Sequence, residues 1–305
     1  MATRYPQAIL VSCEIPWDDR GRLVEDVFRQ EIRGVLQQGF THPYTFGTAG
    51  EGYAVTVAQF EQIVRVFHDE TRKKGVHPMV GVIGLSTPQV VERVRLAHRI
   101  GFREFQISLP SWGALNDDEY VRFFQDVCGS FPDARFLHYN LPRTKRVLRG
   151  SDYRRLIKAV PNLVATKNCR TDITDIYDIA TQAPELQHFY GEHGFPHGCL
   201  FGECSLLASF AALFPTKTKE YFQYGVTGQL DKLFRLHAEF LKAIDAFLAP
   251  TAGRDYIDGA YDKMIVRAAG VDMPLRLLSP YQGFDEKTFR ACVSNLKKRC
   301  PGWIG

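Results

Sequence analysis

Residues 136–142 read Phe-Leu-His-Tyr-Asn-Leu-Pro, an apolar run that carries Tyr139 and ends at a proline. Residues 162–168 read Asn-Leu-Val-Ala-Thr-Lys-Asn, a second apolar run, which carries Lys167 near its end. The polar segment between them, residues 151–160, has the pattern of a helix. The unit is therefore a strand, a helix and a strand. Its step of 28 residues from Tyr139 to Lys167 is close to one repeat of a (β/α)8 barrel, in which about 250 residues hold eight repeats.

Barrel active sites lie at the face where the strands end. Tyr139 and Lys167 are therefore predicted to stand at neighbouring strand ends and to point into one pocket. Burial in such a pocket would lower the pKa of an ammonium group. A neutral amine can attack a carbonyl carbon and form a Schiff base.

Apolar runs alternate with segments of helical spacing along most of the chain. Strands are expected at 8–11, 42–46, 78–83, 105–109, 136–141, 162–167, 187–191 and within 200–213. Helices are expected at 24–39, 56–75, 87–100, 116–128, 151–160 and 172–181, with Thr56 as one N-cap and Ser151 or Asp152 as another. This order predicts an α/β fold, a (β/α)8 TIM barrel over residues 1–215. Residues 216–305 carry only helical patterns, at 230–248, 260–269 and 287–298, and are expected to form a C-terminal helical appendage.

Composition narrows the class of protein. The chain has 305 residues, 45% of them hydrophobic, which is enough for a large core. Its formal charge of +4 is small, and no basic stripe is interleaved with aromatic residues, so nucleic acid is not an expected partner. Seven cysteines without a Cys-x-x-Cys pair are typical of free thiols in a reducing compartment. No apolar run at the N-terminus is long enough for a signal peptide or a membrane span, so a cytoplasmic protein with no membrane partner is expected.

Residues 47–52 read Gly-Thr-Ala-Gly-Glu-Gly and follow the second expected strand. Closely spaced glycines allow backbone N–H groups to converge on an anion. The Gly-Lys-Ser/Thr ending of a phosphate loop is absent. A carboxylate therefore fits better, with the Thr48 hydroxyl as an added donor. The alternative is a tight turn that binds nothing.

Simpler interpretations exist for the other candidates. Tyr139 could be a packing residue, and Lys167 could lie in water if its strand ends one residue earlier. The cluster between Glu192 and Cys204 holds metal-capable side chains, but Gly194 and Pro196 interrupt the helical turn that would place its histidines on one face. We therefore expect neither a metal site nor a cofactor.

Three signatures together resemble the dihydrodipicolinate synthase and N-acetylneuraminate lyase family. They are residues 47–51 (Gly-Thr-Ala-Gly-Glu), residues 139–142 (Tyr-Asn-Leu-Pro) and Lys167 at a strand end. The similarity extends from the first strand near Ile9 to the C-terminal helices. It implies a barrel with C-terminal helices, assembly as a homotetramer, and class I aldolase chemistry on pyruvate or a pyruvate-like 2-oxo acid.

The resemblance also implies roles for individual residues. Lys167 would form the Schiff base and Tyr139 would shuttle protons. Thr48 would orient Tyr139 and, with the backbone of Ala49, hold the substrate carboxylate. The backbone at Gly191 and Leu207 falls near pocket-lining positions of the family. A non-catalytic barrel that binds a small carboxylate is the competing class of protein.

The chain departs from the family pattern in ways that bear on the substrate. Ala49 replaces a second hydroxyl residue, and residues 109–113 hold no tyrosine for the interface relay of the lysine-pathway synthases. Arg143 matches their substrate arginine only with a one-residue shift. A 4-hydroxy-tetrahydrodipicolinate synthase is therefore disfavoured, although it stays an alternative.

Other members of the family offer two further alternatives for the substrate. Trp112 resembles a tryptophan of the branch that hydrates and cleaves aryl-substituted unsaturated pyruvates, or it is an interface or lid residue. Apolar pocket walls that include Trp112 and Phe46 would favour a hydrophobic or aromatic aldehyde fragment. A 2-keto-3-deoxy sugar acid aldolase or dehydratase is the other alternative, with Thr48, His138, His193 and Arg143 as candidate polar contacts.

Overall fold

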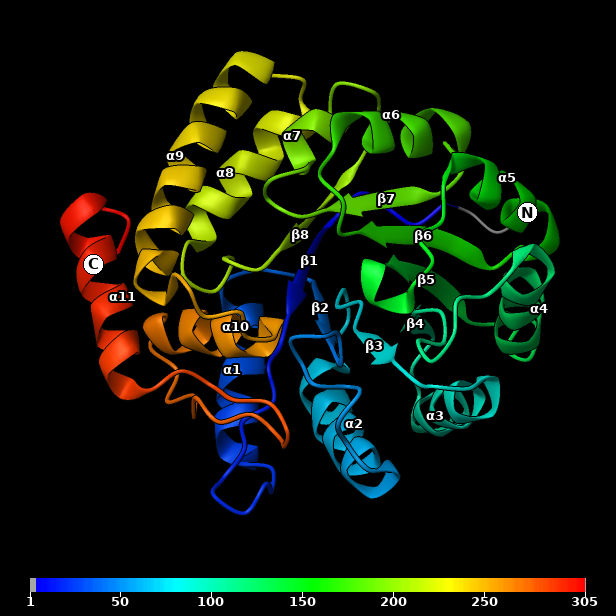
Figure 1. Ribbon diagram of the computed structural model, residues 1–305, viewed down its shortest axis with the longest axis horizontal. Coiled ribbons are helices and arrows are strands. Elements are labelled where there is room, and N and C mark those ends of the chain that lie inside the picture. The colour runs from blue at the N-terminus through cyan, green and yellow to red at the C-terminus, as the bar shows by residue number, and fades with distance from the viewer. Residues whose placement is uncertain (1–3, 305) are drawn as a thin grey trace.

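The computed structural model describes residues 4–304, and eight parallel strands close into a barrel in chain order (Figure 1). The predicted (β/α)8 fold is therefore confirmed. The strands are β1 (Ile9–Ser12), β2 (His42–Thr45), β3 (Met79–Val82), β4 (Glu104–Ile107), β5 (Arg135–Asn140), β6 (Leu163–Asn168), β7 (Gln187–Tyr190) and β8 (Ser205–Ala208).

Helices follow the strands and cover the outside of the barrel (Figure 1). They are α1 (Glu25–Gln37), α2 (Val57–Thr71), α3 (Thr87–Ile100), α4 (Asp117–Cys128), α5 (Gly150–Ala159), α6 (Ile173–Gln182), the short α7 (Phe195–Gly198) and α8 (Pro215–Val226). The 3-10 turn η1 (Pro142–Thr144) follows β5. The predicted N-cap Thr56 is confirmed, since its side chain accepts a hydrogen bond from the Gln59 N–H.

The predicted N-cap of α5 is wrong. The helix begins at Gly150, before Ser151, and the residue at the N-cap is Arg149. The reason lies outside the helix: the Gly150 N–H donates to the Asp178 carboxylate of α6 at 2.8 Å. Asp152 accepts from the Arg149 N–H at 2.9 Å instead of capping the helix itself.

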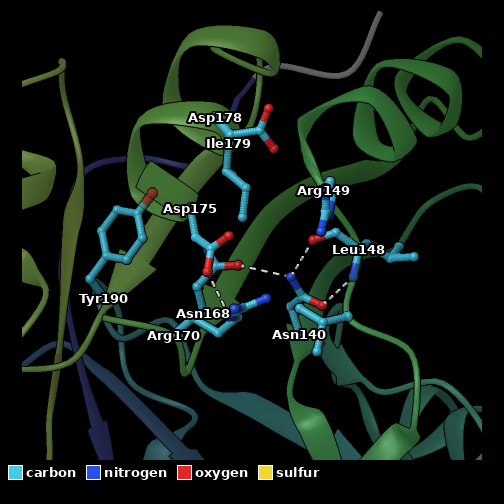
Figure 2. A pocket seen from close by; sticks show the side chains of 10 residues that line it. Asn140, Leu148, Arg149, Asn168, Arg170, Asp175, Asp178, Ile179 and Tyr190 are labelled. Atoms are coloured by element: carbon cyan, nitrogen blue, oxygen red, sulfur yellow. Dashed lines mark hydrogen bonds and ion pairs between the residues drawn. The ribbon is translucent and has the colours of Figure 1, made fainter. Parts of the chain in front are cut away.

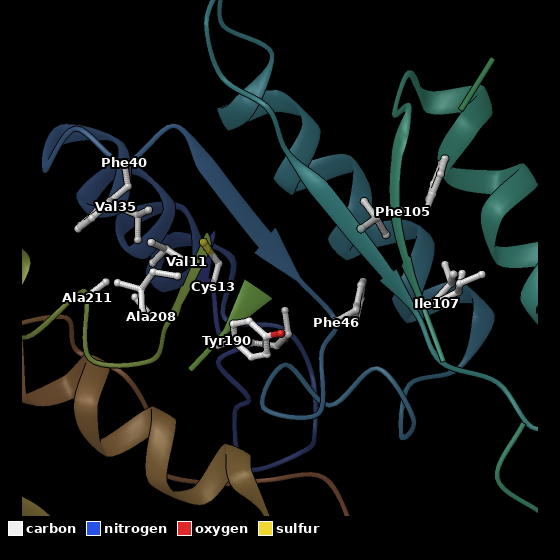
Figure 3. Packing of buried hydrophobic residues seen from close by; sticks show 14 of the residues in the cluster. Val11, Cys13, Val35, Phe40, Phe46, Phe105, Ile107, Tyr190, Ala208 and Ala211 are labelled. Atoms are coloured by element: carbon white, nitrogen blue, oxygen red, sulfur yellow. The ribbon is translucent and has the colours of Figure 1, made fainter. Parts of the chain in front are cut away.

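Side chains alternate between two hydrophobic cores, because successive residues of a strand point to opposite faces. Leu10, Tyr44, Met79, Leu137 and Phe189 form the core inside the barrel. The larger core lies between the sheet and the helices, and Figure 3 shows part of it, from Val11 and Cys13 to Phe105 and Ile107. Side chains two positions from Tyr44 in β2, or from Leu137 in β5, therefore point into the barrel.

The C-terminal region is helical, as expected. It contains α9 (Leu230–Leu248), the 3-10 turn η2 (Ala249–Thr251), α10 (Asp258–Ala268) and α11 (Glu286–Arg299). Helices α9 and α11 lie side by side at one flank of the barrel (Figure 1). Helix α10 lies against the loop that follows β2, where Lys263 pairs with Glu51. The division of the chain at residue 215 stays a prediction. Within residues 4–304, no helix combines the length and the apolar character that crossing a membrane requires.

Candidate active site

Lys167 and Tyr139 are neighbours at the C-terminal ends of β6 and β5. They are partners in the register of the two strands. Lys167 is only 3% exposed, so its side chain does not lie in water. Its Nζ atom stands 3.9 Å from the centroid of the Tyr139 ring, over the electron-rich face. The two side chains are therefore buried against each other at neighbouring strand ends.

Asn140 and Asn168 directly follow Tyr139 and Lys167. Their side chains fix the ends of β5 and β6 from the outer side of the barrel. The Asn140 amide donates to the Leu148 carbonyl at 2.9 Å, accepts from the Leu148 N–H at 2.9 Å and donates to Asn168 at 3.3 Å. Figure 2 shows these contacts in a small polar hollow between the strand ends and α5 and α6. Because Asn140 and Asn168 each follow a pocket residue by one position, they hold Tyr139 and Lys167 in a fixed relation.

Tyr44 is a residue of the pocket that the sequence analysis missed. It lies in β2, and its hydroxyl oxygen accepts a hydrogen bond from Lys167 Nζ at 3.0 Å. Its position in β2 carried a signal, since alternation from His42 points Tyr44 inward. What the sequence did not show is that the Lys167 side chain spans the barrel interior from β6 to β2.

The pKa of Lys167 is set by opposing influences. Burial lowers it, and the oxygens of Tyr139 and Tyr44 raise it, with a net upward direction. The expectation of a lowered pKa from burial alone is thus wrong. The hydrogen bond that Lys167 Nζ donates to the Tyr44 hydroxyl oxygen favours the charged form even when the phenol is neutral. Burial raises the pKa of Tyr139 and of Tyr44, so at neutral pH we assign an ammonium beside two neutral phenols. The amine must therefore lose a proton before it can act as a nucleophile.

The glycine-rich loop passes directly beside the lysine. A Cβ atom at Gly47 would stand 3.0 Å from the Tyr44 ring and 3.6 Å from Lys167 Nζ, so only glycine leaves this approach open. The Thr48 and Tyr139 hydroxyls share a hydrogen bond at 3.4 Å. In residues 4–304, no backbone carbonyl accepts from the N–H of Thr48 or Ala49. These two N–H groups are therefore available to a carboxylate.

Glu51 ties this loop to the C-terminal helices through a buried ion pair. Its carboxylate accepts from Lys263 Nζ of α10 at 2.6 Å, and both side chains are 0% exposed. The same carboxylate accepts from Trp17 Nε1 at 2.8 Å and from the Leu278 N–H at 2.7 Å. Lys263 also donates to the Arg276 carbonyl at 2.6 Å. Both charges therefore have hydrogen bonds beyond the pair itself, which a buried pair needs to be tolerated.

Replacing Lys263 with Met is expected to lower the free energy of unfolding by about 3–5 kcal/mol, because it leaves the Glu51 carboxylate buried without its partner. Equilibrium unfolding in urea measures the loss. The control is Arg290→Met, which breaks an exposed pair with Glu286 and should cost about 0–1 kcal/mol. Equal, small losses in the two variants would show that the buried pair contributes no more to the free energy of unfolding than the exposed pair does.

Acidic side chains gather around Asp262 of α10. Burial raises the pKa of Asp262 in α10, and the charges of Glu14, Asp258 and Glu192 raise it further. Arg143 follows the pocket tyrosine and pairs with Asp258 at 2.8 Å. Surroundings of this kind are polar rather than apolar.

The two aromatic residues expected in the pocket wall lie elsewhere. Phe46 is fully buried, and its ring stacks on Phe60 of α2 at 4.8 Å, in the core outside the barrel (Figure 3). Its positive φ of 62° breaks the alternation at the end of β2, so the expectation of an inward Phe46 is wrong. Trp112 is 83% exposed, in the loop that follows β4. Its carbonyl accepts from Lys145 at 2.7 Å.

The remaining predicted contacts divide between the two faces of the sheet. His138 points away from the pocket and bonds to the Tyr153 hydroxyl of α5 at 2.8 Å, so it is not a substrate contact. Leu207 packs against the core inside the barrel. Gly191 directly follows β7, and its carbonyl accepts from the Phe195 N–H. His193, two residues on, is exposed. Between residues 4 and 304, no three His, Cys, Asp or Glu side chains group so that they could hold a metal ion.

Comparison with known proteins identifies the family of this chain. A model of the dihydrodipicolinate synthetase family matches residues 5–298. An N-acetylneuraminate lyase of Salmonella paratyphi B is 22% identical over 244 residues, which are 79% of this chain and 82% of the lyase.

Solved structures agree in fold. A prophage protein of the dihydrodipicolinic acid synthase family from E. coli K12, in complex with pyruvate, superposes with a TM-score of 0.86 at 16% identity and covers 96% of this chain and 99% of its own. The N-acetylneuraminate lyase of Proteus mirabilis gives a TM-score of 0.84 at 16% identity, with 97% and 99% covered.

Proposed function

We propose, on the premise that the chain belongs to the dihydrodipicolinate synthetase family and is a lyase of the aldolase type, that Lys167 forms a Schiff base with pyruvate or a pyruvate-derived 2-oxo acid. The observation that carries this proposal is a buried lysine whose Nζ lies between two phenols, 3.0 Å from the Tyr44 hydroxyl and 3.9 Å from the centre of the Tyr139 ring. The reaction is the reversible cleavage of a C–C bond next to the iminium carbon.

The pocket supplies each part of this chemistry. The free N–H groups of Thr48 and Ala49 and the Thr48 hydroxyl bind the carboxylate of the 2-oxo acid. Once deprotonated, Lys167 attacks the ketone carbon, and loss of water gives an iminium. The iminium accepts the electron pair of the broken C–C bond. Tyr139, which Thr48 holds through their shared hydrogen bond, moves the protons of the aldol step.

Acidic groups near the pocket favour a hydroxylated fragment as the rest of the substrate. Phe46 is packed in the core outside the barrel and Trp112 is 83% exposed. The charges of Asp258 and Asp262, in contrast, lie close enough to act on Tyr139 and Lys167. Carboxylates accept hydrogen bonds from hydroxyl groups. The similarity to proteins named N-acetylneuraminate lyase also supports a sugar acid. We therefore propose a sugar-acid type of substrate in place of the aromatic fragment.

Trapping with pyruvate and borohydride tests the Schiff base. One reduced pyruvyl group is expected on the peptide that contains Lys167, seen by mass spectrometry, because borohydride reduces an iminium to a stable amine. The Lys167→Arg variant is the control and should carry no adduct. A folded wild-type protein without an adduct would instead indicate a barrel that binds a carboxylate and does not react.

A retro-aldol screen tests the substrate class. Pyruvate release from N-acetylneuraminate, from 2-keto-3-deoxy sugar acids and from an arylidene pyruvate is compared at equal concentration. A sugar acid should give the highest kcat/KM, because its hydroxyl groups match the acidic groups near the pocket. Preference for the arylidene pyruvate would contradict this assignment and would support the aromatic alternative that Trp112 suggested.

A further inference from the structure

The proton that Lys167 must lose has a defined exit on the side away from Tyr139. Nζ donates to the Tyr44 hydroxyl oxygen at 3.0 Å, so any proton leaving along this bond reaches Tyr44 first. A neutral phenol can take that proton only if it passes its own hydroxyl proton onward. The next polar groups beyond Tyr44 therefore determine whether this exit is usable.

Ser12 and Glu14 continue the path from Tyr44. Ser12 of β1 is the register partner of Tyr44 in β2, and alternation places both on the inner face. Glu14 lies two residues further along the same inner face and is 1% exposed. The Ser12 hydroxyl lies near enough to Tyr44 and Glu14 to lower the pKa of each.

Two atoms on this path lack hydrogen-bond partners. Ser12 Oγ and Glu14 Oε2 are buried, and neither has a hydrogen-bond partner within residues 4–304. A buried polar atom that stays unpaired costs stability, so each such atom calls for an explanation. Ser12 is the strand partner of Tyr44, whose hydroxyl holds the lysine, and the Glu14 charge acts on the pKa of that hydroxyl. A hydroxyl and a carboxylate with free bonding capacity are what a proton path requires.

We propose that Tyr44, Ser12 and Glu14 form a relay that removes the proton from Lys167 before Schiff-base formation. The proton moves from Lys167 Nζ to the Tyr44 oxygen, the Tyr44 hydroxyl proton moves to Ser12 Oγ, and the Ser12 hydroxyl proton moves to the Glu14 carboxylate. Ammonium and carboxylate become amine and carboxylic acid, so charge and protons balance. Tyr44 touches the reacting nitrogen and is a catalytic residue. Ser12 and Glu14 act through it.

Glu14 has the surroundings of a proton acceptor that works near neutral pH. Burial raises its pKa to about 7, opposed by Ser12, Lys263 and Lys167. The charged or titratable groups that face it are Cys13 of its own segment, Glu31 of α1, Tyr44 of β2, Glu51 of the glycine-rich loop, Lys167 of β6, and Asp262 and Lys263 of α10. The carboxylate form, which can accept the proton, therefore gains population as the pH rises through about 7.

The relay rests on the proposed Schiff base, and its test separates the two. Wild-type enzyme and the variants Tyr44→Phe and Glu14→Gln are mixed with pyruvate for increasing times between pH 5.5 and 9 and quenched with borohydride, and the adduct on Lys167 is counted by peptide mass. Each variant should form the adduct at least about 10²-fold more slowly at neutral pH, the lower end of the effect of a positioned acid or base. The wild-type rate should rise through about pH 7, and Glu14→Gln should lack that rise.

Matched controls keep the result specific. Tyr190→Phe removes another buried hydroxyl, which has no partner in the described chain and lies in the core outside the barrel. Glu31→Gln keeps an oxygen that can accept from the Glu14 N–H. Both should react at the wild-type rate at neutral pH. Circular dichroism checks folding, and Ser12→Ala serves as a second variant of the path if Glu14→Gln does not fold.

Three outcomes decide between the alternatives. No adduct in the wild-type protein would overturn the Schiff base itself. An adduct that forms at the wild-type rate and with the same pH profile in Tyr44→Phe and Glu14→Gln would overturn the relay alone. A Glu14→Gln variant that weakens only KM for a sugar acid, with normal trapping of pyruvate, would also overturn it, since Glu14 would then contact substrate.

Discussion

Replacing Lys167 with Arg is expected to lower kcat/KM for pyruvate release by on the order of 10⁴-fold or more, because the guanidinium keeps the positive charge but cannot act as a nucleophile. The site makes the substitution informative. Lys167 is almost fully buried, and its Nζ contacts Tyr44 and the Tyr139 ring. Initial rates of retro-aldol cleavage, with pyruvate coupled to a dehydrogenase, give the measurement.

The control for this variant is Lys158→Arg, at an exposed position of α5, which should leave the rate unchanged. Arginine is larger than lysine, so circular dichroism and the melting temperature of Lys167→Arg are compared with the wild type. A folded Lys167→Arg protein with near wild-type turnover would remove Lys167 from the mechanism, whatever its place in the barrel.

Replacing Tyr139 with Phe is expected to lower turnover by about 10²- to 10⁴-fold, the range for a positioned acid–base group. The phenylalanine ring keeps its place against Lys167 Nζ, 3.9 Å from the ring centre in the native protein. The hydroxyl and its 3.4 Å contact with Thr48 are lost. Because burial raises the pKa of Tyr139, this hydroxyl is protonated at neutral pH and able to donate a proton. Steady-state kinetics on the preferred substrate measure the change.

Tyr190→Phe again provides the comparison for loss of a buried hydroxyl. Thr48→Val tests the link to Tyr139 separately and should give a smaller loss, since the proton-carrying oxygen stays in place. If Tyr139→Phe turns over at the wild-type rate while retaining the wild-type melting temperature, Tyr139 is a packing residue, which was the alternative interpretation of the sequence.

The sequence predicted the barrel well because hydrophobic period and capping chemistry are local. The helix from Thr87 to Ile100 and the one from Leu230 to Leu248 agree residue by residue with the structure. Capping boxes at Thr56 and Asn116 mark helix starts with side chains that lie next to them in the chain. The start of α5 was missed because the group that accepts from its first N–H, Asp178, belongs to another helix.

The active site was predicted only in part, for related reasons. Lys167 and Tyr139 could be placed because each ends an apolar run. Phe46 could not, because its left-handed backbone reverses the side that alternation assigns to it. The contact of Lys167 with Tyr44 joins residues 123 positions apart across the barrel, and no local pattern encodes that distance.

The cluster of acidic residues around Asp262 was missed because three parts of the chain build it. Glu14 follows β1, Glu192 follows β7, and Asp262 comes from α10. Each is an ordinary charged residue in its own segment. Only closure of the barrel and packing of the C-terminal helices bring them together. The character of the second substrate fragment therefore depends on tertiary structure more than the identity of the nucleophile does.

The buried pair of Glu51 and Lys263 limits how this scaffold can be recombined with its relatives. A chimaera with a crossover anywhere between the two positions inherits one ion from each parent. If the second parent carries no cation at position 263, the Glu51 carboxylate in the glycine-rich loop would be buried without a partner. Libraries that shuffle barrel and tail should therefore exchange positions 51 and 263 together. Substrate range can then be varied around Asp262 without loosening the glycine-rich loop.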